Sequence, residues 1–162
     1  MMEVSYKAIG VIHSPFKDVH GMPIQAAGAQ GIEGTVEIEP TYQPGLKDLD
    51  GFSHVILIYH FHGSRGYELE VKPFMDDHPR GIFATRAPKR PNPIGMSVVR
   101  LTRVTGCTLC IRDVDILDET PLLDIKPFVP EFDVREAERI GWLSHKSETV
   151  HKVKADKRFG EK

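Results

Sequence analysis

Features that would assign the chain to a class at once are scarce in this sequence. Its 162 residues include only two cysteines, and its formal net charge is −2. Two cysteines cannot form a disulfide framework, and so small a net charge gives no global sign of nucleic-acid binding. No apolar run is long enough for a membrane span, and the first residues lack the layout of a secretory signal. We therefore expect a cytoplasmic protein that keeps Cys107 and Cys110 as free thiols.

Two common catalytic and cofactor motifs are also missing. No Gly-x-Ser-x-Gly elbow is present, so a nucleophilic triad is hard to assemble from this chain. The glycine-rich run 28–34 superficially resembles a phosphate-binding loop, but it precedes a strand-like segment instead of opening a helix. A flexible loop is therefore expected there. The preceding residues Gln25, Ala26 and Ala27 still allow the backbone to approach a ligand closely.

Three histidines raise the question of a metal site. His54, His60 and His62 have even spacing on one expected strand, so they share a face. At about 3.3 Å per residue, His54 and His62 would lie roughly 26 Å apart, too far to share an ion. Only His60 and His62 could chelate together, and isoleucines on the same face indicate core lining. We expect no metal, and we expect His62, at the end of the strand, to face a ligand.

Short β-type runs separated by glycine and proline dominate the chain. They cover residues 6–13, 34–39, 53–62, 68–74, 81–85, 97–107, 108–115 and 122–128. Eight short strands with turn signals between them predict a mainly antiparallel sandwich or barrel.

Helical signals are few. One turn of helix is expected near residues 46–49, and the clearest helix is predicted over 134–140. Asp133 would be its N-cap, with Glu136 at the capping-box spacing and Gly141 after its end. Residues 144–162 are polar and basic, so we expect one domain over 1–143 followed by a polar, mobile tail.

The segment 81–97 is the most informative part of the sequence. Three prolines restrict its backbone, so it cannot easily become helix or central strand. Arg86, Lys89 and Arg90 are thereby held in a limited set of directions, with Asn92 beside them. A stiff loop that presents guanidinium groups and an amide suits a polar, anionic or nucleotide-like ligand. The alternative is a solvated proline-rich crossover.

A second polar segment, 115–127, is acidic where the first is basic. Its carboxylates, Asp115 and Asp118 among them, could accept hydrogen bonds from a ribose or an adenine amine, or act as a general base. The alternative is turn chemistry. Asp124 and Lys126 share a strand face and could simply pair with each other. We expect the basic loop and the carboxylate-bearing strand to meet at one cleft.

Six motifs stand in order over about residues 6–132. They are Ile9-Gly-Val-Ile-His-Ser-Pro-Phe16, Leu49-Asp-Gly-Phe-Ser-His54, Phe61-His62, Gly81-Ile-Phe-Ala-Thr-Arg86, Arg90-Pro-Asn-Pro-Ile-Gly-Met-Ser97 and Asp118-Glu-Thr-Pro-Leu-Leu-Asp-Ile-Lys-Pro127. Together they resemble the family of TrmO-type tRNA methyltransferases, and the Arg-Pro-Asn-Pro-Ile-Gly block is highly specific.

The resemblance implies a fold, a cofactor and a substrate. The fold is a single antiparallel β-barrel that works as a homodimer. The reaction is S-adenosylmethionine-dependent methylation of the adenine N6 of threonylcarbamoyladenosine beside the tRNA anticodon. Carried over motif by motif, the cofactor contacts are Gln25, Ala26, Ala27, His62, Gly63, Arg86, Met96, Arg112, Asp113, Val114 and Asp115.

The chain departs from the family in two places. The bacterial Pro-Arg-Gln-Pro-Gly segment is here Pro23-Ile-Gln-Ala-Ala27, so an arginine contact is absent. Bacterial members also carry a further C-terminal domain, which we do not expect in this chain. Both differences bear on the substrate more than on the cofactor.

Roles in the reaction follow as hypotheses. Asp115 or Asp118 would bind the adenosine of the cofactor or accept the proton that leaves the target nitrogen. Asn92 would orient a polar edge of substrate or cofactor. The expected RNA and carboxylate contacts are the basic side chains of Lys89, Arg90 and Lys126.

Two other functions stay open from the sequence. The protein could be an S-adenosylmethionine-binding relative that acts on another small molecule or adenosine derivative, or that only senses the cofactor. A metal-dependent β-barrel enzyme of cupin type is the third interpretation.

Overall fold

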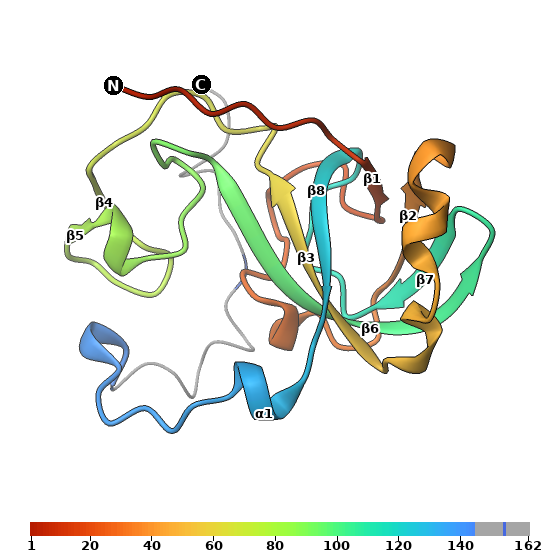
Figure 1. Cartoon of the computed structure of the whole chain (residues 1–162). Helices are drawn as coiled ribbons and strands as arrows, with labels where there is room; N and C mark the ends of the chain where they lie inside the picture. Colours follow the sequence, from red (N-terminus) through yellow and green to blue (C-terminus); the bar gives the residue numbers. More distant parts are fainter. Residues whose placement is uncertain (145–153, 155–162) are drawn as a thin grey trace.

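The computed structural model describes residues 1–144 and Lys154. Within them, strands β1 (Gly10–His13), β2 (Glu33–Ile38), β3 (His54–His60), β6 (Ile94–Thr105), β7 (Thr108–Arg112) and β8 (Thr120–Pro127) form a closed antiparallel barrel in the order β1-β2-β7-β6-β3-β8. The predicted mainly β, barrel-type fold is therefore confirmed. Strands β4 (Glu70–Val71) and β5 (Arg80–Gly81) pair with each other beside the barrel (Figure 1).

Alternation along the strands builds the core. In β3, Val55, Leu57 and Tyr59 are buried, while the residues between them are half-buried on the outer face. The isoleucines of this strand, which were expected to line the core, therefore lie on its outer face. The same pattern holds in β6, where Val99 is fully buried. Period-two alternation of this kind places every second side chain inside a closed sheet. The core therefore lies along the barrel axis, and the loops that leave one barrel end are free to form a site.

Most strand predictions are correct, with shifted ends. The first strand begins at Gly10 instead of residue 6, and the predicted strand 81–85 is mostly a 3-10 turn, η4 (Ile82–Ala84). Other 3-10 turns are η1 (Ala26–Gly28), η2 (Pro40–Leu46), η3 (Leu49–Gly51) and η5 (Gly141–Leu143). The helical turn expected over 46–49 does not form there: residue 46 ends η2 and residue 49 begins η3.

The helix predicted over 134–140 is wrong. The helix that forms is α1 (Pro130–Asp133), which ends where the prediction began. Pro130 suits the first helical position because it lacks the N–H that would be unpaired there. Asp133 is the last residue of α1, and its carboxylate accepts the backbone N–H of Val129 at 2.7 Å. The Asp133 side chain therefore stabilises the start of α1, which precedes it, and does not cap a helix that follows it.

The predicted tail falls almost wholly on residues 145–153 and 155–162, which lie outside the described residues. Lys154 forms an isolated bridge with Pro23. Within the part of the chain that the structure describes, no helix is both long and apolar enough to cross a membrane.

One glycine is essential to the end of the barrel that carries the loops. Gly95 of β6 lies opposite Tyr59 of β3, and a Cβ at Gly95 would come within 2.2 Å of the Tyr59 ring and 2.9 Å of Phe61. The two rings meet edge to face, with centroids 5.5 Å apart. The glycine therefore leaves the space in which this aromatic pair packs.

We predict that Gly95→Ala lowers the free energy of unfolding by roughly 1–3 kcal/mol, the usual cost of overpacking a core. Chemical denaturation followed by circular dichroism measures it. Gly45→Ala is the control, because no atom lies within 4 Å of a Cβ at Gly45. Equal stability of the two variants would contradict this account of the packing.

Candidate active site

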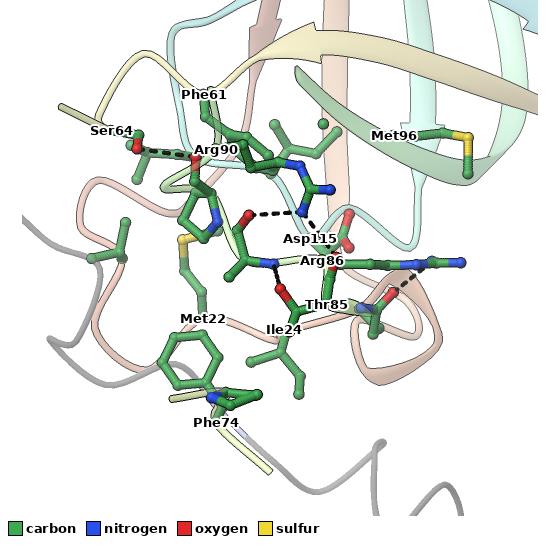
Figure 2. Close-up of a pocket in the computed structure, with 18 of the residues that line it drawn as sticks. Met22, Ile24, Phe61, Ser64, Phe74, Thr85, Arg86, Arg90, Met96 and Asp115 are labelled. Carbon is green, nitrogen blue, oxygen red and sulfur yellow. Dashed lines mark hydrogen bonds between the residues drawn. The ribbon is translucent and has the colours of Figure 1, made fainter. Parts of the chain in front are cut away.

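A cavity of about 750 Å³ opens where β3 and β6 meet the loops beside the barrel. That volume is toward the upper end of the ~300–1,000 Å³ range of small-molecule sites. Seven stretches of the described chain supply most of its walls: 22–25, 61–64, 73–75, 83–88, 94–96, 115–117 and 142–143. Figure 2 shows Arg86 and Asp115 close together in the middle of this lining, with Met96 to one side and Phe74 at the opposite side. The basic loop and the acidic segment therefore meet at one cavity, as predicted.

Arg90 fixes the shape of the loop that forms one wall. Its Nη1 donates to the carbonyl oxygens of Ile82, Thr85 and Ala87, at 3.2, 2.8 and 3.3 Å. Its guanidinium also lies 5.9 Å from the ring centroid of Phe83. Hydrogen bonds from a charged donor are the strong kind, so Arg90 substitutes for the backbone pairing that this proline-rich loop lacks. Arg90 was expected to contact RNA, but in the structure its guanidinium bonds to the backbone of its own loop.

Arg86 has a different setting from Arg90. It is exposed, lines the cavity, and donates through Nη1 to the Gln25 side-chain oxygen at 3.1 Å. Gln25 is neutral, so this contact positions the guanidinium without cancelling its charge. Arg86 is therefore available to a negatively charged group in the cavity.

A chain of three polar side chains leads from the barrel interior to the cavity. The hydroxyl of buried Tyr59 lies 2.9 Å from Ser97 Oγ, and Ser97 Oγ donates to Asp115 Oδ1 at 2.6 Å. Since Ser97 gives its only proton to the carboxylate, Tyr59 must donate to Ser97. Burial raises the pKa of the Tyr59 hydroxyl, so it stays a donor. The chain therefore holds Asp115 in one orientation.

The pKa of Asp115 rises from 3.8 to about 6, mainly because burial penalises the charged carboxylate. The hydrogen bond from Ser97 and the positive charge of Arg86 oppose the rise. Asp115 is thus ionised at neutral pH and more basic than an ordinary aspartate. A carboxylate tuned in this way, lining a cavity, is typical of a general base.

Hydrogen bonding assigns the tautomer of His62. Thr120 Oγ1 donates its single proton to the carbonyl oxygen of Leu117 at 2.7 Å, and it lies 3.3 Å from His62 Nδ1. His62 Nδ1 must therefore carry a proton and donate it to Thr120. In the neutral ring this leaves Nε2 as an acceptor on a side chain that lines the cavity.

The structure gathers only part of the predicted site. The cavity is lined by Gln25, His62, Gly63, Arg86, Arg90, Met96 and Asp115. Ala26 and Ala27 lie next to Gln25 in η1, outside the lining. The others lie elsewhere: Lys89, Asn92, Arg112, Asp113, Val114, Asp118 and Lys126.

Several of these distant residues have local partners. Lys89 pairs with Glu68 at 3.2 Å, and Lys126 pairs with Asp124 at 2.8 Å, the alternative considered for that pair. Asn92 is exposed.

The predicted cofactor contacts in the segment 112–114 have local roles as well. Arg112 donates to Glu33 at 2.8 Å. Asp113 accepts the backbone N–H of Gly31 at 2.8 Å, and Val114 is fully buried in the core. Of the four neighbours from 112 to 115, only Asp115 reaches the cavity.

Asp118 lies in a second, polar groove, which His13 and Lys17 also line. It forms an ion pair with Lys17 and accepts the backbone N–H of Ser14 at 3.0 Å. The hydrogen bond from Lys17 is the main reason that the pKa of Asp118 falls to about 2. The two candidate bases, three residues apart in sequence, therefore have opposite pKa shifts and different surroundings.

Several lining residues were missed in the sequence. Tyr59 and Thr120 line the cavity, and Ser97 lies behind them as the hydrogen-bond donor to Asp115. All three sit on strands and are mostly buried, so their hydroxyls are easily taken for core or turn chemistry. Trp142 lines the cavity from a segment with no recognisable motif. Among the described residues, no group of three or more His, Cys, Asp and Glu side chains could hold a metal ion.

Comparison with known proteins identifies the class of this barrel and cavity. Residues 11–134 match the family model of the tRNA-methyltransferase O N-terminal domain, and the chain belongs to this family. The family and its curated relatives are named for S-adenosylmethionine-dependent methyl transfer or S-adenosylmethionine binding, so the predicted family, enzyme class and cofactor are confirmed at that level.

Two relatives illustrate the range. A probable S-adenosyl-L-methionine-binding protein of Pyrococcus abyssi is 59% identical over 156 residues, which cover 96% of this chain and 85% of the relative. The tRNA (adenine(37)-N6)-methyltransferase of Escherichia coli is 34% identical over 140 residues, which cover 80% of this chain and 60% of that enzyme.

Solved structures agree with the fold. The crystal structure of TrmO from Pseudomonas aeruginosa superposes with a TM-score of 0.73 at 38% identity, covering 87% of this chain and 63% of that one. A second TrmO crystal structure gives a TM-score of 0.75 at 40% identity, covering 86% and 64%. The chain thus spans about three fifths of the length of these crystallised proteins.

We predict that the two aspartates affect stability with opposite dependence on pH. The folded pKa of Asp118 is below 3.8, so its ionised form stabilises the fold above that pH, and this contribution disappears as the pH falls through about 2. Asp118→Asn should therefore lower the melting temperature at pH 7, with the loss shrinking toward pH 2.

Asp115 should show the reverse. Its folded pKa of about 6 is above 3.8, so its contribution to stability is greatest below pH 3.8 and is lost as the pH rises through 6. Asp115→Asn should raise the melting temperature at pH 7 and leave it nearly unchanged at pH 3.5. Calorimetric melting of both variants across pH tests the pair. The same pH trend in both would contradict the two assignments.

Proposed function

We propose that this protein transfers a methyl group from S-adenosylmethionine to the adenine N6 of threonylcarbamoyladenosine, beside the anticodon of tRNA. Family membership supports the cofactor and tRNA, and the name of the Escherichia coli relative supports the adenine N6 at position 37. The observation that carries the proposal is the meeting of Arg86 and Asp115 in one cavity. A tRNA substrate would place the protein in the cytoplasm.

The lining residues fit S-adenosylmethionine. This cofactor combines a carboxylate, a positively charged sulfur and an adenosine, and the cavity combines a cationic side chain, a carboxylate and apolar walls. Arg86 would hold the cofactor carboxylate, while Gln25 and His62 offer polar atoms to its remaining groups. Ile24 and Phe61 supply apolar surface. When bound, the cofactor supplies an electrophilic methyl group on sulfur.

Asp115 is the base in this proposal. The N6 nitrogen of the substrate must lose a proton as it gains a methyl group, and a carboxylate with a pKa of about 6 can take that proton at neutral pH. Ser97 and Tyr59 keep the carboxylate oriented and reduce the freedom it must lose. Asp118 is not suited to the role, because its ion pair with Lys17 makes it a weak base outside the cavity.

We predict that Asp115→Asn lowers the rate of methyl transfer by roughly 10²–10⁴-fold, the usual contribution of a positioned base. Asp118→Asn is the matched control and should keep the rate within a few-fold. Labelled S-adenosylmethionine is incubated with tRNA that carries or lacks threonylcarbamoyladenosine, and label in the RNA is counted. Equal rates for the two variants would contradict the role of Asp115.

The same assay separates the proposal from its alternative. Four archaeal relatives are named only for S-adenosyl-L-methionine binding, so a different adenosine-type substrate is the second candidate. Label that enters only modified tRNA supports the proposal. Cofactor binding by calorimetry without label in either tRNA would support the alternative.

We also propose that the protein works as a homodimer through the outer face of β3 and β6. Ile56 and Ile58 of β3 lie on that face, and Met96 of β6, opposite Ile58, is 51% exposed. An apolar outer face is unusual for an antiparallel barrel in water, where that face is normally polar. Because Met96 also lines the cavity, a partner on this face would lie beside the site.

We predict that Ile58→Lys converts the dimer to a monomer, as measured by size-exclusion chromatography with light scattering. The lysine would lie opposite Asp124 of β8, so the barrel itself should tolerate it. Thr108→Lys, on the outer face of β7 opposite Glu37, is the control and should stay dimeric. A monomeric wild-type protein would refute this interface.

A further inference from the structure

Trp142 is the single tryptophan of the sequence, and it lies outside the 11–134 region that matches the family. It nevertheless lines the cavity, together with Leu143 of η5. The cofactor-facing residues Gln25, His62, Arg86 and Met96 all fall inside the family region. The cavity is therefore completed by an aromatic ring that the family match does not include.

The indole is held in a defined orientation. Its Nε1–H donates to the carbonyl oxygen of Ala84 at 2.8 Å, and the Arg80 guanidinium lies 5.7 Å from its ring centroid. Arg80 is in turn fixed by buried Asp76, through Nε at 2.8 Å and Nη2 at 2.7 Å. A side chain ordered in advance loses little entropy when a ligand binds. Trp142 is thus built as a rigid surface.

Its anchors also locate it within the cavity. Arg80, Asp76 and Ala84 belong to the segment 73–84, which supplies Phe74 and Met75 to the lining. Figure 2 places Phe74 at the side opposite Met96, with Arg86 and Asp115 between them. We call Phe74 and Trp142 the aromatic wall. Phe74 and Met96 thus lie on different sides of one cavity, and Trp142 is anchored to the segment that carries Phe74.

We propose that the aromatic wall receives the adenine base of the RNA substrate after it has left its stack. This inference rests on the proposed function. A base buried in an anticodon loop must unstack to reach a cavity, and an aromatic ring can replace the lost stacking. Trp142 lies outside the family region, while the residues proposed to hold the cofactor lie inside it, which favours the substrate base over the cofactor adenine as the occupant at the indole.

The single tryptophan makes a direct test possible. The emission of Trp142 is followed while wild-type protein is titrated with S-adenosylmethionine alone, and then with an anticodon stem-loop RNA that carries threonylcarbamoyladenosine. We expect the RNA, and not the cofactor, to quench the emission. Quenching by the cofactor alone, with no further change on adding RNA, would assign the wall to the cofactor and overturn the inference.

Variants supply an independent readout. Trp142→Ala should weaken RNA binding by roughly 5- to 150-fold, the equivalent of one stacked base, while the calorimetric affinity for S-adenosylmethionine stays within about twofold. Trp142→Phe should restore most of the RNA affinity. Phe132→Ala is the control, since Phe132 is 74% exposed on α1 and outside the cavity lining.

The outcomes also separate this inference from the proposed function. Wild-type methyl transfer to RNA with unchanged RNA affinity in Trp142→Ala would overturn the aromatic wall alone. No RNA binding and no transfer by the wild-type protein would overturn both.

Discussion

The rest of the site depends on the hydrogen bonds that Arg90 donates to its own loop. Its guanidinium donates to three carbonyl oxygens of a loop whose prolines cannot form a backbone ladder. Because Arg90 fixes this loop from within, Arg86 is left to face the cavity and Ala84 is left to accept the indole N–H of Trp142. Two nearby arginines on one stiff loop thus have different roles: Arg90 fixes the backbone of the loop, and Arg86 faces the cavity.

The opposite behaviour of Asp115 and Asp118 follows from what surrounds each carboxylate. Asp118 has an ammonium group and a backbone N–H, which favour its charged form. Asp115 is half-buried beside a serine hydroxyl, and its hydrogen bonds do not offset the loss of water. The same residue type is therefore a stabilising ion in one place and a candidate base in the other.

Much of the fold and part of the site could be predicted from the sequence. Alternation and turn signals predicted the strands, and the family motifs predicted the barrel. The sequence could not show which of Asp115 and Asp118 faces the cavity. Both lie just before the turn that leads into β8, where Glu119 has a positive φ of 60°, and the surroundings of each carboxylate depend on that turn. Nor could the sequence show that Lys126 and Arg112 would be held by Asp124 and Glu33, since such pairs depend on which strands become neighbours. The error at residues 134–140 has a local cause: a good capping residue was assigned to the wrong turn.

The anchoring of Trp142 through Arg80 and Asp76 ties residues from both sides of the family boundary at 134 into one structural unit. A recombinant fragment that stopped at that boundary would keep every barrel strand and still lack Trp142 and Leu143 from the lining of the cavity. The end of the family region at residue 134 is therefore not the end of the domain that carries the cavity. A shortened protein made for crystallisation or engineering should retain the chain at least through Leu143.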